Sequence, residues 1–343
     1  MVRRRNVGFF YGSLASGADI LFVEAGLTAN RDAHVVLPFK REDFVRVSVA
    51  DSGDGWVDRF DRCLNHEKVK TSYVTEDAFQ NQNLIFSHAA QRAMGLAVLQ
   101  ARHLDADLRQ IAVWNGEDTG GDAGTAADVR FWRELGQPTD VIGPPSGMRP
   151  EADVPPAPET SQNTVYRLRE LKALVFADVK GFSKLDDAMF PDFVEVVLDP
   201  ISGVMDRQGD SLEFRNIWGD GLFSVFSDVE RAACCALEMQ SALSVIDYAH
   251  HNLPSGLALR IGCHFGPVFV MEDPITNRLG YFGGHVNKAA RIEPVTPPGE
   301  VYVSEAFAAH LALVCDELDC EYVGDVASAK GYGSFRMYLL REA

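Results

Sequence analysis

The chain has 343 residues, enough for two domains with separate hydrophobic cores. Hydrophobic residues make up 46% and charged residues 24% of the sequence, a globular composition that excludes wholesale disorder. The net charge of −17 excludes a general nucleic-acid-binding surface, and no apolar stretch is long enough to predict membrane insertion.

The cysteines and the first residues bear on the cellular compartment. The six cysteines form no C-x-x-C pair and no zinc-binding spacing, which is typical of reduced, buried thiols in a cytosolic protein. The basic start, Met1–Arg5, precedes an apolar run as in a secretory signal, but Asp19, Glu24 and several glycines interrupt that run. We therefore expect a cytoplasmic protein.

The N-terminal part shows strands that alternate with helices. Short apolar runs typical of buried strands occupy residues 6–11, 34–39, 110–114 and 140–143. Helical spacing covers residues 20–26 and 83–104. This alternation predicts a Rossmann-like parallel α/β domain.

A proline-rich segment follows. Six prolines and almost no aromatic residues lie between Gly143 and Asn163, as in an extended, solvated linker. We therefore predict an N-terminal domain over residues 1–145, a linker over 146–164 and a C-terminal domain over 165–343.

The C-terminal part is expected to be α+β with antiparallel strands. The Asp220-Gly221 pair joins two alternating runs, 212–218 and 222–226, and predicts a β-hairpin. Further strands are expected at 173–177, 257–265, near 301 and at 335–340. Helices are expected at 166–171, 187–205, 229–250 and 287–294.

Two carboxylates and a polar helix face could carry chemistry. Asp178 ends a buried strand and Asp220 lies at the hairpin tip, so together they would offer hard oxygen ligands to Mg²⁺ or Mn²⁺. Asn287 and Arg291 are four residues apart and share a helix face, where Arg could stabilise charge on a phosphoryl group. Taken singly, each of these residues is more often a turn-former or a solvated surface residue.

Six motifs in order, however, resemble the class III nucleotidyl cyclase domain of the adenylate and guanylate cyclase family. They cover about 175 residues and read Phe176-Ala-Asp-Val-Lys-Gly-Phe-Ser, Trp218-Gly-Asp-Gly-Leu-Phe-Ser-Val-Phe, Arg260-Ile-Gly-Cys-His-Phe-Gly-Pro-Val, Tyr281-Phe-Gly-Gly-His-Val-Asn-Lys-Ala-Ala-Arg-Ile-Glu, Pro298-Gly-Glu-Val-Tyr-Val-Ser and Lys330-Gly-Tyr-Gly. The resemblance implies a ferredoxin-like domain that forms a 3′,5′-cyclic nucleotide and pyrophosphate from a nucleoside triphosphate.

The resemblance also implies roles for individual residues. Asp178, Asp220 and the carbonyl of Val179 would bind two Mg²⁺ or Mn²⁺ ions, while Asn287 would orient the ribose and Arg291 would stabilise the pentavalent phosphorus. The triphosphate would be held by Lys330, Gly181, Phe182 and Arg260. Because one chain carries both the metal carboxylates and the Asn, Arg and Lys set, a homodimer with two shared sites is expected.

The base-selecting positions depart from the familiar members. Asn216 stands where adenylate cyclases usually carry Lys, and Gly280 stands where they carry Asp or Thr. The pattern Arg215-x-x-Trp218 resembles uridylate cyclases of the Pycsar antiphage group, in which Trp would exclude a purine by volume. This favours UTP as substrate, cyclic UMP as product, phage infection as trigger and a cyclic-nucleotide-binding effector as downstream partner.

Other interpretations of the same residues remain open. CTP could replace UTP, or the domain could be a regulated ATP or GTP cyclase with different selectors, in which case Trp218 is a core residue. A non-catalytic nucleotide-binding sensor is a third alternative. In a regular strand, Arg215 faces away from Asn216 and Trp218, so it would reach the base only if a bulge broke the alternation.

The N-terminal domain resembles the SLOG-type Rossmannoid group over about a hundred residues. The resemblance rests on the turn Gly12-Ser-Leu-Ala-Ser-Gly-Ala-Asp and the following run from His34 to Phe39. It implies a ligand sensor in which the turn receives nucleotide phosphates, with candidates Gly12, Ser13, Gly17 and Asp19. The alternative is a structural or dimerising domain without a ligand.

Overall fold

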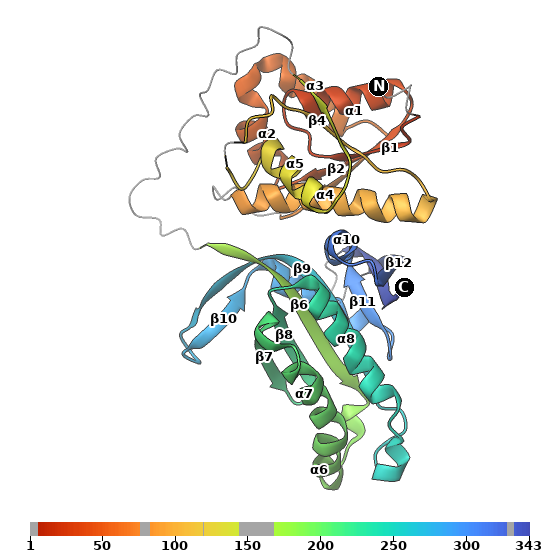
Figure 1. Cartoon of the computed structure of the whole chain (residues 1–343). Coiled ribbons are helices and arrows are strands. Elements are labelled where there is room, and N and C mark those ends of the chain that lie inside the picture. Colours follow the sequence, from red (N-terminus) through yellow and green to blue (C-terminus); the bar gives the residue numbers. More distant parts are fainter. Residues whose placement is uncertain (1–5, 76–82, 119, 144–167, 328–332) are drawn as a thin grey trace. The chain divides into compact units, whose positions relative to one another are not determined.

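The computed structural model describes residues 6–75, 83–118, 120–143, 168–327 and 333–343, and the chain forms two compact units (Figure 1). The first unit spans Met1–Leu168 and the second spans Arg169–Ala343. The predicted linker, residues 146–164, lies outside the described residues.

The first unit is a parallel α/β structure, as predicted. Its main sheet has the order β1-β2-β3, built from β1 (Phe9–Gly12), β2 (Asp32–Leu37) and β3 (Val69–Tyr73). A second parallel pair consists of β4 (Gln110–Val113) and β5 (Thr139–Ile142). The sequence did not predict β3, because its segment Val-Lys-Thr-Ser-Tyr lacks the apolar run that marks the other strands.

Five α-helices accompany these strands in the described part of the first unit: α1 (Ala18–Thr28), α2 (Arg41–Ser48), α3 (Asp54–Leu64), α4 (Asn83–Leu104) and α5 (Thr125–Glu134). Helix α4 packs against β1 and β2, and α1 packs against α3. Fully buried aromatic side chains, Phe39, Phe44 and Phe60, form much of the core. The predicted helices at 20–26 and 83–104 are confirmed.

The second unit is built on an eight-stranded, mostly antiparallel sheet. Seven strands have the order β12-β13-β11-β9-β6-β8-β7, and β10 pairs with β9. Their bounds are β6 (Arg169–Lys180), β7 (Leu212–Trp218), β8 (Gly221–Phe226), β9 (Ala258–Asp273), β10 (Arg278–Phe282), β11 (Val301–Ser304), β12 (Leu318–Ala327) and β13 (Ser334–Glu342). The predicted hairpin around Gly219 and Asp220 is confirmed as the β7–β8 connection.

Helices cover both faces of this sheet. They are α6 (Phe190–Phe193), α7 (Asp199–Asp206), α8 (Val229–Ser244), α9 (Gly284–Ala289) and α10 (Glu305–Val314). The ring of Phe265 on β9 stacks on His310 of α10, while the next residue, Gly266, approaches His285 of α9. Because neighbouring strand residues point to opposite faces, α9 and α10 lie on opposite sides of β9.

The helix predicted at 166–171 is wrong where the structure describes it. Arg169–Leu171 belong to β6, which pairs with β8 on one side and β9 on the other. The Arg169 guanidinium lies 4.7 Å from the centre of the Phe269 ring on β9, so tertiary contacts override the local helical pattern.

The cysteines agree with the sequence prediction. All six are free thiols, and all but Cys234 are buried. Within the described ranges, no helix combines the length and the apolar character needed to cross a bilayer.

His310 makes the stability of the second unit sensitive to pH. Burial lowers the pKa of its imidazole to about 4, from about 6.5. As the pH falls from 7.5 to 5, the unfolded chain binds a proton that the folded chain does not, so His310 contributes a stability loss of about 2 kcal/mol. We expect H310Q to show a weaker fall in urea-unfolding free energy over this range, and an unchanged pH dependence would contradict this assignment.

Candidate active site

Asp178 and Asp220 meet at one edge of the second unit's sheet. Asp178 pairs with Gly221 in the β6–β8 ladder, which places the hairpin tip beside it. Burial raises the pKa of the Asp220 carboxyl, and the nearby charge of Asp178 and a hydrogen bond with its side chain raise it further. The structure thus brings the two predicted metal-binding carboxylates together, with the buried side chain of Val179 anchoring the end of the strand.

The turn after β6 lies against the same hairpin. Gly181 begins it with a φ of +95°, and Gly219 begins the hairpin turn with a φ of +67°, both in the left-handed region that favours glycine. The Phe182 ring lies 3.6 Å from where a side chain on Gly219 would start, and it also packs edge-on against Phe190 and Phe193. The predicted phosphate-binding turn and the hairpin tip are therefore one packed structure.

Arg260 connects the carboxylates with a third acid. It lies opposite Asp178 in the β6–β9 ladder, and its Nη2 forms ion pairs with Asp178 and, at 2.9 Å, with Oε1 of Glu293. Burial raises the pKa of Glu293 to about 7; Arg260 opposes this rise, and Asp178 and Asp220 add to it. Sequence reasoning missed Glu293, although it ends the quoted motif two residues after Arg291.

This donor set fits a divalent cation that also contacts a phosphate ligand. Within the described residues, no three His, Cys, Asp or Glu side chains gather closely enough to hold a metal ion by themselves. Mg²⁺ is usually held by one or two carboxylates together with substrate phosphates and water, rather than by a complete protein cage. The charges of Asp178 and Asp220 repel each other, and a cation bound between the two carboxylates would relieve this repulsion.

Asn287 and Arg291 form a second group, on and just after α9. The side chain of Asn287 is exposed and that of Arg291 is partly buried. The helix predicted at 287–294 is wrong in its bounds, because α9 ends at Ala289 and Arg291 lies in the turn that follows it. Arg291 Nη1 nevertheless donates a hydrogen bond to the Asn287 carbonyl oxygen at 2.7 Å, which keeps the two residues together. Lys330, the predicted triphosphate ligand, lies outside the described residues.

The candidate base-selecting residues on β7 divide between its two faces. The ladder with β8 runs without interruption from Phe214 to Trp218, because the bulge lies earlier, between Leu212 and Phe214. Arg215 therefore faces away from Asn216 and Trp218, and its Nη1 forms a 2.6 Å ion pair with Asp206 of α7. Trp218 is 62% exposed, so the alternative that it is a core residue is wrong.

Gly280, the other candidate, lies on β10 in a crowded position. A side chain there would begin 2.8 Å from the Phe282 ring, so the ring occupies the space of the usual Asp or Thr. The rings of Phe214 on β7 and Tyr281 on β10 are in edge contact, with centroids 5.6 Å apart. This contact joins the strands that carry Asn216 and Gly280.

A buried polar network that sequence reasoning missed supports these two strands. Lys172 of β6 is 6% exposed, and its Nζ lies 2.7 Å from Glu213 and 2.8 Å from Glu170. The Tyr281 hydroxyl donates to the other oxygen of Glu213 at 2.9 Å. No local sequence pattern links these residues, because they come from three separate strands.

The N-terminal ligand candidates surround the turn between β1 and α1. Gly12 ends β1 and Ser13 follows it, while Gly17 precedes α1 with a φ of +94°. The Asp19 carboxylate accepts a hydrogen bond from the Ala15 amide at 3.1 Å, and burial raises its pKa. Asp19 therefore faces its own loop.

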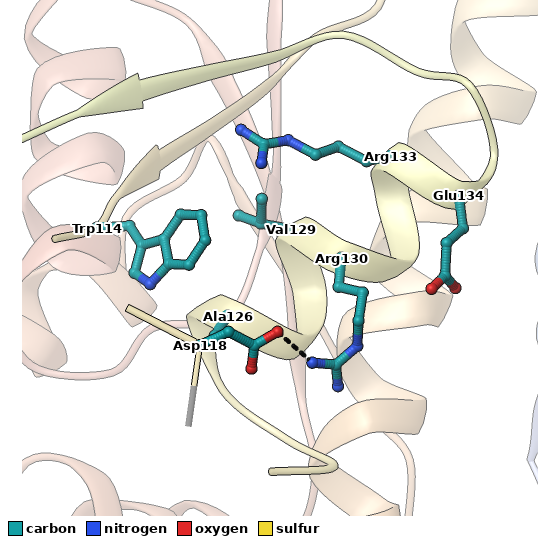
Figure 2. A pocket seen from close by; sticks show the side chains of 7 residues that line it. All are labelled: Trp114, Asp118, Ala126, Val129, Arg130, Arg133 and Glu134. Atoms are coloured by element: carbon teal, nitrogen blue, oxygen red, sulfur yellow. Dashed lines mark hydrogen bonds and ion pairs between the residues drawn. The ribbon is translucent and has the colours of Figure 1, made fainter. Parts of the chain in front are cut away.

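A cavity of about 350 Å³ lies elsewhere in the first unit, between the end of β4 and α5 (Figure 2). The Arg133 guanidinium lies 5.8 Å from the centre of the Trp114 ring, and Arg130 forms a 2.5 Å ion pair with Asp118. None of the four N-terminal ligand candidates lines it. Its lining residues are Trp114, Asp118, Ala126, Val129, Arg130, Arg133 and Glu134.

Comparisons with known proteins agree on the second unit. Residues 168–342 match the family model of the adenylate and guanylate cyclase catalytic domain. An adenylate cyclase of Neurospora crassa is 27% identical over 207 residues, covering 53% of this chain and 8% of the relative. A putative adenylate cyclase 3 of Rhizobium meliloti is 32% identical over 146 residues, covering 40% of this chain and 22% of the relative.

Solved structures of cyclases align with about half of the chain. The adenylyl cyclase CyaB of P. aeruginosa shows 20% identity and a TM-score of 0.45, covering 51% of this chain and 95% of that one. The guanylate cyclase domain of RhGC from Catenaria anguillulae, in complex with GTP, shows 19% identity and a TM-score of 0.42, covering 50% and 97%. The chain spans less than a quarter of the two curated relatives named above. On the match of residues 168–342, which is half of its length, the chain belongs to the adenylate and guanylate cyclase catalytic domain family.

Proposed function

We propose that the chain is a metal-dependent nucleotidyl cyclase that converts a nucleoside triphosphate into a 3′,5′-cyclic nucleotide and pyrophosphate. The observation that carries this proposal is the junction of Asp178 and Asp220 at the hairpin tip, with Arg260 beside them. In the reaction the ribose 3′-oxygen forms a bond to the α-phosphorus and loses its proton to solvent. The bond between the α-phosphorus and the bridging oxygen breaks, and pyrophosphate leaves.

Each group of side chains would supply one part of this chemistry. A divalent cation bound by Asp178 and Asp220 would activate the attacking oxygen and neutralise phosphate charge. Arg260 would exchange its carboxylate partners for triphosphate oxygens, with Lys330 and the turn at Gly181 and Phe182 holding the same group. Asn287 would orient the ribose, and Arg291 would stabilise charge on the α-phosphoryl group.

We propose a homodimer in which each site combines carboxylates of one chain with Asn287 and Arg291 of the other. Exposed apolar side chains on β7 and β10 support this arrangement. Ile217 is 45% exposed and Trp218 62% exposed on β7, and on β10 Leu279 is 53% exposed and Phe282 38% exposed. Their exposure leaves both faces of β7 and β10 available for contact with a second copy of the chain.

We propose UTP as the preferred substrate and cyclic UMP as the product, in antiphage signalling through a cyclic-nucleotide-binding effector. Trp218 is exposed on the same face of β7 as Asn216, where it could limit the size of the base. The Phe282 ring occupies the space at Gly280 where the carboxylate that would accept a hydrogen bond from an adenine amino group would begin. ATP is the alternative substrate, favoured by the adenylate cyclases among the relatives.

The test of this function is incubation of the full chain with ATP, GTP, CTP and UTP, each with Mn²⁺, followed by chromatography and mass spectrometry. Dominant cyclic UMP supports the whole proposal. Dominant cyclic AMP supports the cyclase but contradicts the pyrimidine selection. No cyclic product from any nucleotide contradicts the cyclase and favours the nucleotide-binding sensor.

The size of Trp218 is expected to control the choice of base. In W218A, the ratio of kcat/KM for ATP to that for UTP should rise by about 10-fold or more, since removing a bulky side chain admits the larger ring. The control is V245A, which removes an apolar side chain that is 82% exposed and lies at the end of α8, not on β7. It should leave this ratio unchanged. An unchanged ratio in W218A would show that Trp218 does not read the base.

The first unit is proposed to sense a phosphate-bearing ligand at the turn Gly12–Asp19 and to regulate the cyclase. Support comes from its parallel α/β fold and from the position of this turn before α1. Gly12, Ser13 and Gly17 carry the proposal, because the Asp19 carboxylate already bonds to its own loop.

A further inference from the structure

Three side chains form a hydrogen-bonded chain through the interior of the second unit. His264 Nδ1 lies 2.7 Å from Ser304 Oγ, and His264 Nε2 lies 2.8 Å from His285 Nδ1. The two imidazoles are nearly parallel, at 10°, with centroids 5.1 Å apart. His264 is 1% exposed and Ser304 3% exposed, so water does not compete for these bonds.

Protons can be assigned consistently along the hydrogen-bonded chain of Ser304, His264 and His285. The Phe307 amide donates to Ser304 Oγ at 3.3 Å, leaving the Ser304 hydroxyl able to donate to His264 Nδ1. His264 can then donate from Nε2 to Nδ1 of His285. Every link is satisfied with both rings neutral, and breaking one link would leave a buried polar atom without its partner.

The three residues belong to three separate elements. Ser304 ends β11, His264 lies in the long strand β9, and His285 is the second residue of α9. The His285 ring packs directly on the β9 backbone, because a side chain on Gly266 would begin only 2.3 Å from His285 Nδ1. The hydrogen-bonded chain thus ties α9 to the centre of the sheet.

Helix α9 needs such a tie. It has six residues, Gly284–Ala289, and helices of this length are not stable without tertiary contacts. It also carries Asn287, and Arg291 follows it closely. A small displacement of its first turn would shift both side chains relative to the nucleotide.

We propose that the His264–His285 hydrogen bond is a positioning pair for nucleotide cyclisation, which sets the place of Asn287 and Arg291 through α9. The inference rests on the proposed cyclase function. Both histidines are buried and would act only through α9. The effect should therefore appear in kcat, because Asn287 and Arg291 would act on the transition state. Nucleotide KM should change little.

Amide substitutions can test each bond separately. The amide of Asn lies near the place of Nδ1 of His, and the amide of Gln lies near that of Nε2. H285N and H264Q therefore retain the bond between the two positions, whereas H285Q and H264N lose it. We expect kcat to fall by about 10-fold or more in H285Q and H264N and by less than about threefold in H285N and H264Q.

Asn retains the bond at position 285 and breaks it at position 264, whereas Gln does the reverse. A loss of kcat that follows the bond, and not the residue introduced, distinguishes positioning from general stability. H310N serves as the matched control, since His310 is a partly buried histidine of α10 that stacks on Phe265, on the other face of β9 from α9. H310N should lower the melting temperature but leave kcat unchanged. Equal kcat values in the four amide variants, or values that follow their melting temperatures, would overturn the proposal.

A second measurement does not depend on how well the histidine variants fold, because it is made on the parent protein. NMR of the parent after histidine-specific nitrogen labelling should show a slowly exchanging imidazole N–H resonance. The S304A variant should retain this resonance. Rapid exchange of every imidazole proton in the parent would overturn the hydrogen bond itself. A parent without cyclase activity on any nucleotide would instead refute the proposed function, and the positioning role with it.

Discussion

Replacement of Asp178 or Asp220 by asparagine is expected to lower kcat on the order of 1,000-fold, because each change removes a charged oxygen ligand from the proposed cation site. Stability should respond differently at the two positions. Burial and Asp178 already disfavour the charge on Asp220, so D220N should fold at least as stably as the parent. D178N loses an ion pair with Arg260 and should be somewhat less stable.

Product formation and thermal unfolding of the same preparations check this pair of effects. D187N is the matched control, since Asp187 is an exposed acid in the neighbouring loop and should retain parental kcat. Retained cyclase activity in D220N would remove this carboxylate from the mechanism. A large loss of stability in D220N would show that the acidic cluster is a structural feature.

Two inactive variants are expected to restore activity when they are mixed. D178N damages the metal side of each shared site, and N287A damages the ribose side. In a random heterodimer both defects fall in one site, which leaves the other site intact. Unfolding and refolding an equimolar mixture should therefore restore about one quarter of parental activity.

The control mixture combines D178N with D220N, whose defects lie on the same side of the site, so no pairing leaves an intact one. It should remain inactive after the same treatment. Restoration in both mixtures would reflect residual activity of the variants. Restoration in neither, with intact dimers, would place all the site residues within one chain and contradict the shared arrangement.

Local sequence patterns predicted the parts of the site that local physics determines. The Asp220-Gly221 pair specifies the hairpin, and the buried run before Asp178 specifies the strand that delivers it to the same edge. The spacing of Asn287 and Arg291 predicts that they lie close together, although the helix that carries Asn287 ends before Arg291.

Long-range contacts determine the parts that sequence reasoning missed. Glu293 enters the acidic cluster only because the β6–β9 ladder places Arg260 between it and Asp178. Lys172 is buried in β6 with the help of Glu213, which arrives from β7 and adds a second ion pair to the one with Glu170. The same effect explains the helix wrongly expected at 166–171, since pairing of Arg169–Leu171 with β9 outweighs local propensity.

The Arg260 bridge has a thermodynamic consequence for ligand binding. Its guanidinium compensates the charge of Asp178 and Glu293 in the nucleotide-free protein. A triphosphate that draws the guanidinium away leaves those carboxylates uncompensated and so raises their affinity for a divalent cation. By linkage, the cation must raise the affinity for the triphosphate by the same factor. Nucleotide and cation should therefore bind with positive cooperativity, and neither alone should bind tightly.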